Sequence, residues 1–167
     1  MHLIIKLTVV AVLCLFAMPI AAAEKKAIGA VEDIVIFPWG LTLAARIDTG
    51  AATSSLDVCD FKVVGKYVTF TLADRCGGHK IRRPLLGTKT IHTSDGSGQR
   101  PIVMMEICLG STLIKTRVTL NDRSKMEYPV LIGRRTLRGK YIVDVSSKNL
   151  LPPTCPGVKP DFIPDLK

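Results

Sequence analysis

Apolar and polar residues alternate with a period of two in several short segments of this 167-residue chain. In one of them, Leu41, Leu43, Ala45 and Ile47 occupy every second position, which is typical of a strand with one buried face. Short apolar or β-branched segments predict further strands at 27–37, 61–64, 67–72, 88–93, 101–109, 113–120, 128–133 and 141–145.

Turn residues separate these segments about every eight to twelve residues, and no long segment has the 3.6-residue period of an amphipathic helix. Gly65 and Gly110 mark two predicted hairpin turns, 82–84 is expected to be an irregular link, and 134–138 predicts one helical turn. Many short strands at this spacing predict an all-β barrel or sandwich.

The N-terminal residues 1–23 have the composition of a secretory signal peptide. A Lys precedes a short apolar run, and Ala21, Ala22 and Ala23 supply a small-residue cleavage site. We expect release after Ala23, with an uncleaved anchor as the alternative. The released chain would be periplasmic or secreted, with no stable membrane span.

Residues 24–151 are predicted to form one domain, and residues 152–167 are predicted to form a proline-rich, extended and weakly packed tail.

The charge of the chain favours anionic partners. Loss of 1–23 removes one Lys and no acid, so the formal charge falls from +9 to +8. Acidic peptides, cell-envelope polymers and phospholipid headgroups are the candidates. One Trp, three Tyr and five Phe give few stacking platforms, so we expect no nucleic-acid partner.

Four cysteines remain after cleavage: Cys59, Cys76, Cys108 and Cys155. In an oxidising compartment an even number predicts disulfides, and four cysteines allow three connectivities. Cys59 and Cys76 flank the hairpin at Gly65, which gives their pairing a weak preference.

There is no C-x-x-C and no H-x-x-x-H, so we expect no metal and no cofactor.

Asp48 is the candidate for chemistry, because it stands where a predicted strand ends and the flexible Thr49-Gly50 turn begins. An Asp in such a place is either turn punctuation or a catalytic acid. A second feature, the apolar segment Val130-Leu131-Ile132-Gly133-Arg134, follows much later in the chain.

Together these two segments resemble the core of aspartic peptidases, and the order of segments from 103 onward resembles the C-terminal half of a retroviral protease. More specifically, the chain resembles a bacterial retropepsin-like family whose members are often labelled ATP-dependent zinc proteases. The residues that carry the resemblance are Ile47–Ala51, Thr53-Ser54, Arg100-Pro101, Asp122–Ser124, Met126, Tyr128-Pro129 and Leu131–Arg134.

The resemblance implies a retropepsin-like closed β-barrel with one short helix near the C-terminus. The zinc and ATP label finds no support in the residues, because the chain has neither H-E-x-x-H nor G-x-x-x-x-G-K-[ST]. The residues instead support acid–base chemistry by an Asp.

The family mechanism uses two carboxylates that share one proton, and this chain has a single Asp-Thr-Gly. The resemblance therefore implies a homodimer with Asp48 from each copy. It also implies that Thr49 braces the pair, that Gly50 admits the substrate backbone and that Ala51 lines the floor.

The resemblance places a substrate-covering flap at 93–99. The residues assigned to substrate binding are Ala51, Thr53, Ser94, Asp95, Gly96, Arg100, Arg123, Gly133 and Arg134.

Two departures from the retroviral pattern change these expectations. Ala52 replaces the acid that would pair with the Arg of the apolar strand, so Arg134 is expected to find another partner in Asp122 or Asp144. The flap tip is more polar than a retroviral one.

Basic residues near the presumed cleft predict a peptide or protein substrate that is acidic: Arg82, Arg83, Arg100 and Arg123. Some members of the family are associated with enzymes that add glutamate tails.

The leading hypothesis is therefore an exported aspartic-type endopeptidase with a dyad of Asp48 residues. The first alternative is a catalytically silent retropepsin-like fold that binds peptide or envelope polymer in the same groove. The second is a structural envelope protein in which Asp48 is turn punctuation.

Overall fold

The computed structural model describes residues 24–72, 78–93 and 96–157. In chain order, the elements in this part of the chain are β1 (Lys26–Ile28), β2 (Val31–Phe37), β3 (Leu41–Asp48), β4 (Ser54–Val64), β5 (Tyr67–Leu72), β6 (Lys80–Pro84), β7 (Gly87–Thr93), β8 (Gly96–Leu109), β9 (Thr112–Asn121), β10 (Val130–Gly133), α2 (Arg134–Leu137) and β11 (Tyr141–Val143).

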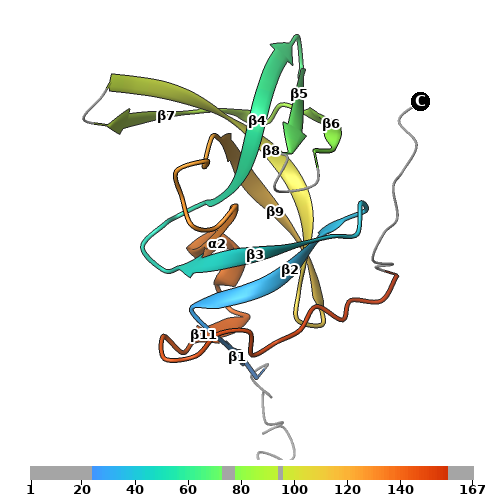
Figure 1. Ribbon diagram of the computed structural model, residues 1–167, viewed down its shortest axis with the longest axis vertical. Coiled ribbons are helices and arrows are strands. Elements are labelled where there is room, and N and C mark those ends of the chain that lie inside the picture. Colours follow the sequence, from blue (N-terminus) through green and yellow to red (C-terminus); the bar gives the residue numbers. More distant parts are fainter. Residues whose placement is uncertain (1–23, 73–77, 94–95, 158–167) are drawn as a thin grey trace, which may run out of the picture.

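Six strands close into a barrel in the order β10, β3, β2, β8, β9 and β4, and β4 pairs back with β10 (Figure 1). Alternate positions of each strand turn inward and bury their side chains, as Leu43, Ala45 and Ile47 do in β3. The all-β class and the closed barrel are confirmed, and α2 lies where one helical turn was predicted.

Strand β10 closes the barrel by lying between β3 and β4. It runs parallel to β3, with Gly133 opposite Asp48, and antiparallel to β4, with Leu131 opposite Ser55. The chain leaves the barrel after β3 and returns as β4, so the connecting residues 49–53 pass over the end of β10. This crossing brings the Asp-Thr-Gly segment against β10, the apolar segment with which the sequence analysis associated it.

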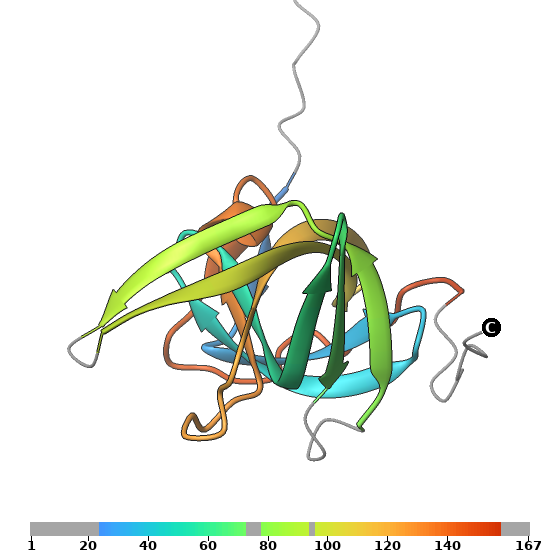
Figure 2. The same cartoon turned by 90° about the horizontal axis from the view of Figure 1, so that it is seen from above.

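The second half of β4 leaves the barrel and forms a separate sheet with β5 and β6 (Figure 2). The predicted hairpin at Gly65 is confirmed, and this residue has a φ of 57°. The irregular link expected at 82–84 is wrong, because Lys80–Pro84 is strand β6. Pro84 is its last residue and β6 is the edge of the sheet, where the missing N–H of a proline costs no ladder bond.

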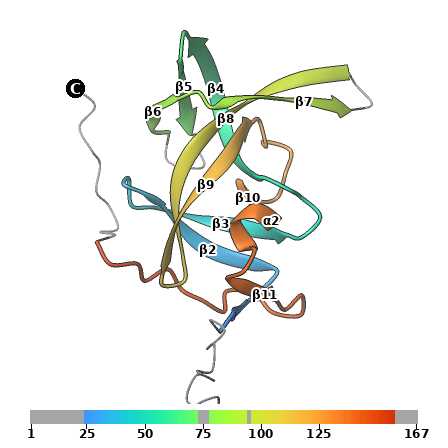
Figure 3. The same cartoon turned by 180° about the vertical axis from the view of Figure 1, so that it is seen from behind.

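Strands β7 and β8 form a two-stranded arm that extends from the barrel (Figures 1 and 3). Their register runs from Gly87 opposite Ile102 to Thr93 opposite Gly96. This hairpin stands where the resemblance placed the flap, while Ser94 and Asp95 at its tip lie outside the described residues.

The single strand predicted at 27–37 is two strands, because the C-terminal segment 144–157 packs against the break at Gly29. A Cβ on Gly29 would lie 2.5 Å from the Ser147 carbonyl oxygen, and the Ala30 N–H donates to that oxygen at 2.8 Å. We call 144–157 the C-terminal strap.

Glu32 anchors the strap from inside the fold. Its side chain is fully buried, and its carboxylate accepts hydrogen bonds from the N–H groups of Gly29, Leu150 and Leu151 at 2.5, 3.0 and 3.0 Å. A buried carboxylate without such donors would cost several kcal/mol, roughly, so this acid and the strap depend on each other.

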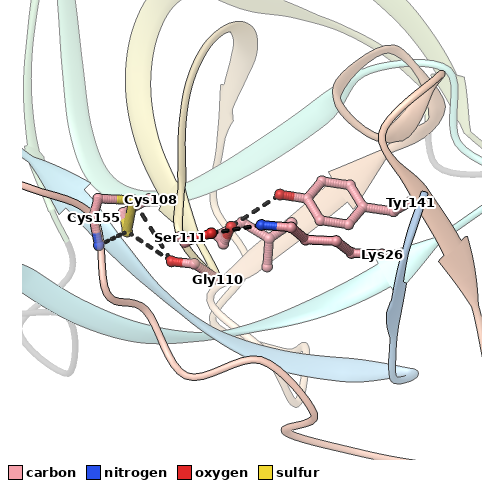
Figure 4. Close-up of a disulfide and its surroundings, with 7 residues drawn as sticks. Lys26, Cys108, Gly110, Ser111, Tyr141 and Cys155 are labelled. Carbon is pink, nitrogen blue, oxygen red and sulfur yellow. Dashed lines mark hydrogen bonds between the residues drawn. A yellow bond between two sulfur atoms is a disulfide. The ribbon is translucent and has the colours of Figure 1, made fainter. Parts of the chain in front are cut away.

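A disulfide between Cys108 and Cys155 ties the strap to β8 (Figure 4). The Thr154 N–H also donates to the Gly110 carbonyl at 2.8 Å. The weak preference for a Cys59–Cys76 bond is wrong, since Cys59 is an exposed free thiol; Cys76 lies outside the described residues. The tail was expected to be weakly packed from residue 152, but it is held firmly at Cys155, which is buried.

Two side-chain contacts hold the turn between β8 and β9 against the terminal strands (Figure 4). The Tyr141 hydroxyl donates to the Leu109 carbonyl at 2.9 Å, and the Lys26 ammonium donates to the Ser111 hydroxyl at 2.5 Å. Burial raises the pKa of the Tyr141 phenol, so the group remains protonated and donates throughout the neutral range.

The predicted signal peptide and residues 158–167 lie outside the described residues. Within the part of the chain that is described, no helix has the length and apolar character needed to cross a membrane.

We expect Cys155→Ser to lower the free energy of unfolding by about 2–4 kcal/mol, because the bond closes a long loop. Urea unfolding without reductant measures this change. Cys59→Ser is the matched control and is expected to change stability by less than about 0.5 kcal/mol, since the thiol is exposed. Equal effects of the two substitutions would contradict the assignment.

Candidate active site

Asp48 is the last residue of β3, and its half-buried carboxylate is oriented by the turn that follows. One oxygen, Oδ1, accepts hydrogen bonds from the N–H groups of Gly50 at 2.8 Å and Ala51 at 3.0 Å. The other oxygen has no protein partner among the described residues. The two hydrogen bonds to Oδ1 thus fix the orientation of the carboxylate, and its second oxygen, Oδ2, remains available to bind another group.

Gly50 leaves room for this carboxylate. A Cβ built on Gly50 would lie 3.1 Å from Asp48 Oδ1, so any larger residue would crowd the oxygen that the turn holds. Glycine is required here because the Asp48 carboxylate lies so close to the Gly50 backbone, and not because the backbone is strained.

The turn rests on β10. A Cβ on Gly133 would lie 2.7 to 2.9 Å from three backbone atoms of Thr53, which leaves no space for a side chain. Two further backbone bonds run from Arg134 N–H to the Ala51 carbonyl at 2.9 Å and from Arg135 N–H to the Ala52 carbonyl at 3.3 Å. The loop is therefore attached along its length to the start of α2.

Arg134 adds a side-chain clamp to the same loop. Its Nη1 donates to the carbonyl oxygens of Thr49 at 2.7 Å and Gly50 at 2.6 Å. The expectation of an acidic partner for Arg134 is wrong, because two backbone carbonyls take that place. The Asp144 carboxylate instead accepts from Ser146 and Ser147, and these hydrogen bonds lower the pKa of Asp144.

A buried chain of hydroxyl groups braces the site from below, and sequence reasoning missed it. The Thr136 hydroxyl on α2 lies 2.8 Å from the hydroxyls of both Ser54 and Thr116, and Ser54 Oγ accepts from the Gly133 N–H at 3.1 Å. The available signal was Thr116, a polar residue on the buried face of β9 between Ile114 and Val118.

The arginines assigned to the cleft are dispersed. Arg100 lies half-buried on the β8 side of the arm, opposite Lys89. Arg123 is buried; its Nε donates to the Tyr128 carbonyl at 3.1 Å, and its backbone N–H donates to Asp57 Oδ1 at 2.5 Å. Arg123 therefore organises the loop before β10 from within.

Arg82 and Arg83 belong to β6 and lie on the separate sheet. The Arg82 guanidinium carbon stacks 3.7 Å from the centre of the Tyr67 ring, and that of Arg83 lies 4.6 Å from the centre of the Trp39 ring. Burial lowers the pKa of Arg83, while the nearby Glu106 opposes that shift. Neither residue is close in the sheet order to β3 and β10, which hold Asp48.

The face that carries Thr49 is open. Thr49 is exposed, and it borders a shallow hollow of about 410 Å³ whose apolar lining comes from Leu137, Tyr141 and Val143. Arg134 and Arg138 complete its rim.

A family model described as RimB-like, for the retropepsin-like aspartic endopeptidase RimB, matches residues 27–154. The chain belongs to the RimB-like family. This confirms the resemblance inferred from the Asp-Thr-Gly and apolar-Gly-Arg segments.

Relatives and structures agree with this membership. The chain is 31% identical over 135 residues to a protein named probable alpha-L-glutamate ligase from Shewanella pealeana, covering 74% of this chain and 30% of that protein. A protein of the same name from Desulfotalea psychrophila is 28% identical over 131 residues, which cover 72% of this chain and 28% of that one. The RimB-like chain thus spans less than a third of the length of these relatives.

A solved structure of a Legionella pneumophila protein of unknown function has a TM-score of 0.67 with this chain. The two are 27% identical, and the likeness covers 76% of this chain and 98% of the other.

We expect Arg134→Ala to loosen the loop at 49–51 without unfolding the barrel, because the hydrogen bonds that its exposed guanidinium makes with the described residues go to that loop. Amide hydrogen exchange at Gly50 and Ala51 is expected to become about fivefold faster, equivalent to one net hydrogen bond of about 1 kcal/mol. Arg135→Ala is the matched control, since its side chain makes no hydrogen bond with the described residues. Unchanged exchange in Arg134→Ala would contradict the clamp.

Proposed function

We propose that this chain is an exported aspartic-type endopeptidase whose active site is completed by a second copy. The observation that carries the proposal is the Asp48 carboxylate, held through Oδ1 by two N–H groups with its other oxygen unengaged. Family membership supports the same chemistry.

In the proposed reaction, the Asp48 carboxylates of two copies share one proton. The ionised one takes a proton from water, whose oxygen attacks the peptide carbonyl carbon. The protonated one donates its proton to the carbonyl oxygen. The C–N bond then breaks as the leaving nitrogen receives a proton, which gives one carboxyl and one amine product.

The open face at Thr49 supports a two-fold pairing. Ile142 and Val145, which neighbour Val143 of this hollow in the sequence, are exposed by 59% and 82%. In the proposed dimer, Thr49 braces the two carboxylates and Gly50 admits the substrate backbone.

The proposed substrate-binding residues are those implied by the family resemblance, and two of them, Ser94 and Asp95, lie outside the described residues. Ala51 and Thr53 are half-buried in the loop, Arg100 is on the arm, and we place Ser94, Asp95 and Gly96 over the bound peptide. Gly133 and Arg134 support the loop at 49–53, and Arg123 supports the loop before β10, through the contacts described above.

An acidic peptide is the proposed substrate class. The net charge of +8 on the released chain favours it, and the relatives whose name concerns glutamate agree with it. The ligase activity in that name belongs to proteins about three times longer. Because those relatives are not named peptidases, the second candidate is a peptide-binding fold without catalysis.

We propose the periplasm or the extracellular space as the location. The Cys108–Cys155 disulfide is typical of an oxidising compartment, and it agrees with the predicted signal peptide.

We expect Asp48→Asn to lower peptide cleavage by at least about a thousandfold, because it removes both the base and the acid of the pair. Asp60→Asn, an exposed acid on β4, is the matched control and should retain full activity. A bell-shaped dependence of kcat/KM on pH would report the shared proton.

Sedimentation of the active enzyme should show a dimer. A monomer that cleaves peptides, or cleavage that survives Asp48→Asn, would contradict the dyad. Peptide binding without cleavage between about pH 3 and 8, a range that spans ordinary carboxyl and imidazole titration, would favour the binding fold.

A further inference from the structure

The second half of β4 forms with β5 a hairpin that projects from the barrel (Figures 1 and 2). Its strands pair as far as Val64 opposite Tyr67, and Gly65-Lys66 makes the turn. On its other side β4 pairs with β9 and β10 no further than Asp57. Beyond that residue, this edge of the strand has no partner strand in the described part of the chain.

The end of the β4–β5 hairpin exposes several apolar side chains. Val63, Val64 and Tyr67 are exposed by 44, 61 and 40%, and Phe61, further back on β4, is exposed by 45%. None of the four belongs to the buried core. Neighbouring apolar side chains that the core leaves exposed are typical of a surface that binds a partner or a membrane.

Two lysines flank this apolar tip. Lys62 precedes Val63-Val64 and Lys66 follows it in the turn, and both are exposed. Neither side chain makes a hydrogen bond or an ion pair with the described residues, so both ammonium groups are available to an anion.

The outer face of the β4–β5–β6 sheet continues this positive charge. Lys62, Thr69 and Arg82 form one row across the three strands, and the next row joins Asp60 through Thr71 to Lys80. Asp60 is the acid of this face among the described residues, and it stands in the row further from the tip.

A hollow of about 330 Å³ lies on the same face. Lys62 and Lys80 line it with the side chains of Thr69 and Thr71, and Asp60 forms part of its wall. Two ammonium groups and two hydroxyls around one hollow suit a phosphate group, which accepts charge-assisted hydrogen bonds.

An apolar tip with cations behind it is suited to the boundary between phospholipid headgroups and acyl chains. Amphipathic segments enter this boundary to a depth of about 5–10 Å. Lys62 lies two residues behind Val64, which is about 6.6 Å along a strand, so it comes level with the phosphates when the tip is inserted. Lys side chains extend toward headgroups, and Tyr is typical of this boundary.

A second copy of the chain complements this face less well. A two-fold interface presents the same patch from both sides. Cations outnumber acids in this patch, so the same positive charges would meet across the interface. An anionic surface neutralises them instead.

We propose that the β4–β5 hairpin and the outer face of β4, β5 and β6 bind the surface of an anionic phospholipid bilayer. Val63, Val64 and Tyr67 enter the bilayer surface, while Lys62 and Lys66 contact headgroup phosphates. Asp48 takes no part in this binding, so the inference is independent of the proposed peptidase.

The test is sedimentation with lipid vesicles of the chain that begins at Glu24, the predicted released form, which contains every described residue. An equimolar mixture of phosphatidylglycerol and phosphatidylcholine supplies the anionic surface, and phosphatidylcholine alone supplies the neutral one. The wild-type chain is expected to partition at least about tenfold more strongly onto the anionic vesicles. Added salt should weaken this binding.

A charge variant locates the binding surface. Lys62→Gln combined with Lys66→Gln should lower partitioning onto anionic vesicles about tenfold or more, since each cation near such a surface contributes roughly fivefold. Lys115→Gln combined with Lys148→Gln removes the same charge from exposed positions outside this sheet and is the matched control. It should retain nearly full binding, and an equal loss in both double variants would overturn the assignment to the hairpin.

An apolar variant tests insertion of the tip. Val64→Asp should lower partitioning about tenfold or more, because a carboxylate is costly among acyl chains and is repelled by anionic headgroups. Leu113→Asp is the matched control, since Leu113 is 43% exposed beside the turn between β8 and β9. Circular dichroism confirms that each variant is folded, and the lysine variant tests the same surface if Val64→Asp is not.

Equal partitioning of the wild-type chain onto anionic and neutral vesicles would overturn the proposal, as would full binding by both hairpin variants. A Val64→Asp chain that keeps vesicle binding but loses self-association without lipid would also overturn it, because a second copy would then be the occupant. Peptide cleavage is measured separately, so failure of this proposal leaves that of the peptidase unaffected.

Discussion

The close contact between Gly133 and the backbone of Thr53 is the constraint on which the site depends. It lets β10 pass directly beneath the loop at 49–53, with less than 3 Å between a would-be Cβ and the loop backbone. Because β10 is also paired with β3 and β4, the loop is held by the same strand that closes the barrel. The pairing that closes the barrel therefore also fixes the position of Asp48.

Hydrogen bonds on both sides of that contact further restrict the conformation of the loop at 49–53. Arg134 holds two loop carbonyls from outside, and the hydroxyls of Ser54, Thr116 and Thr136 join β4, β9 and α2 from inside. The carbonyl oxygens of Thr49 and Gly50 serve as the partners of Arg134 in place of the acid that the retroviral pattern would put at position 52.

The opposite end of the molecule is stabilised by different means. Glu32 and the Cys108–Cys155 bond attach the C-terminal strap to β2 and β8, which ties residues from both ends of the described chain together. This arrangement leaves the face with Thr49 and its apolar hollow uncovered.

The sequence by itself determined much of the strand pattern, because period-two burial is a local property, but it missed the first half of β4. The resemblance to aspartic peptidases paired Asp48-Thr49-Gly50 with the segment ending at Gly133. Tertiary structure decided what no local pattern encodes: the break at Gly29, strand β6, the Cys108–Cys155 bond and the partner of Arg134. Each depends on which distant segment lies alongside, as the strap does at Gly29 and the loop does at Arg134.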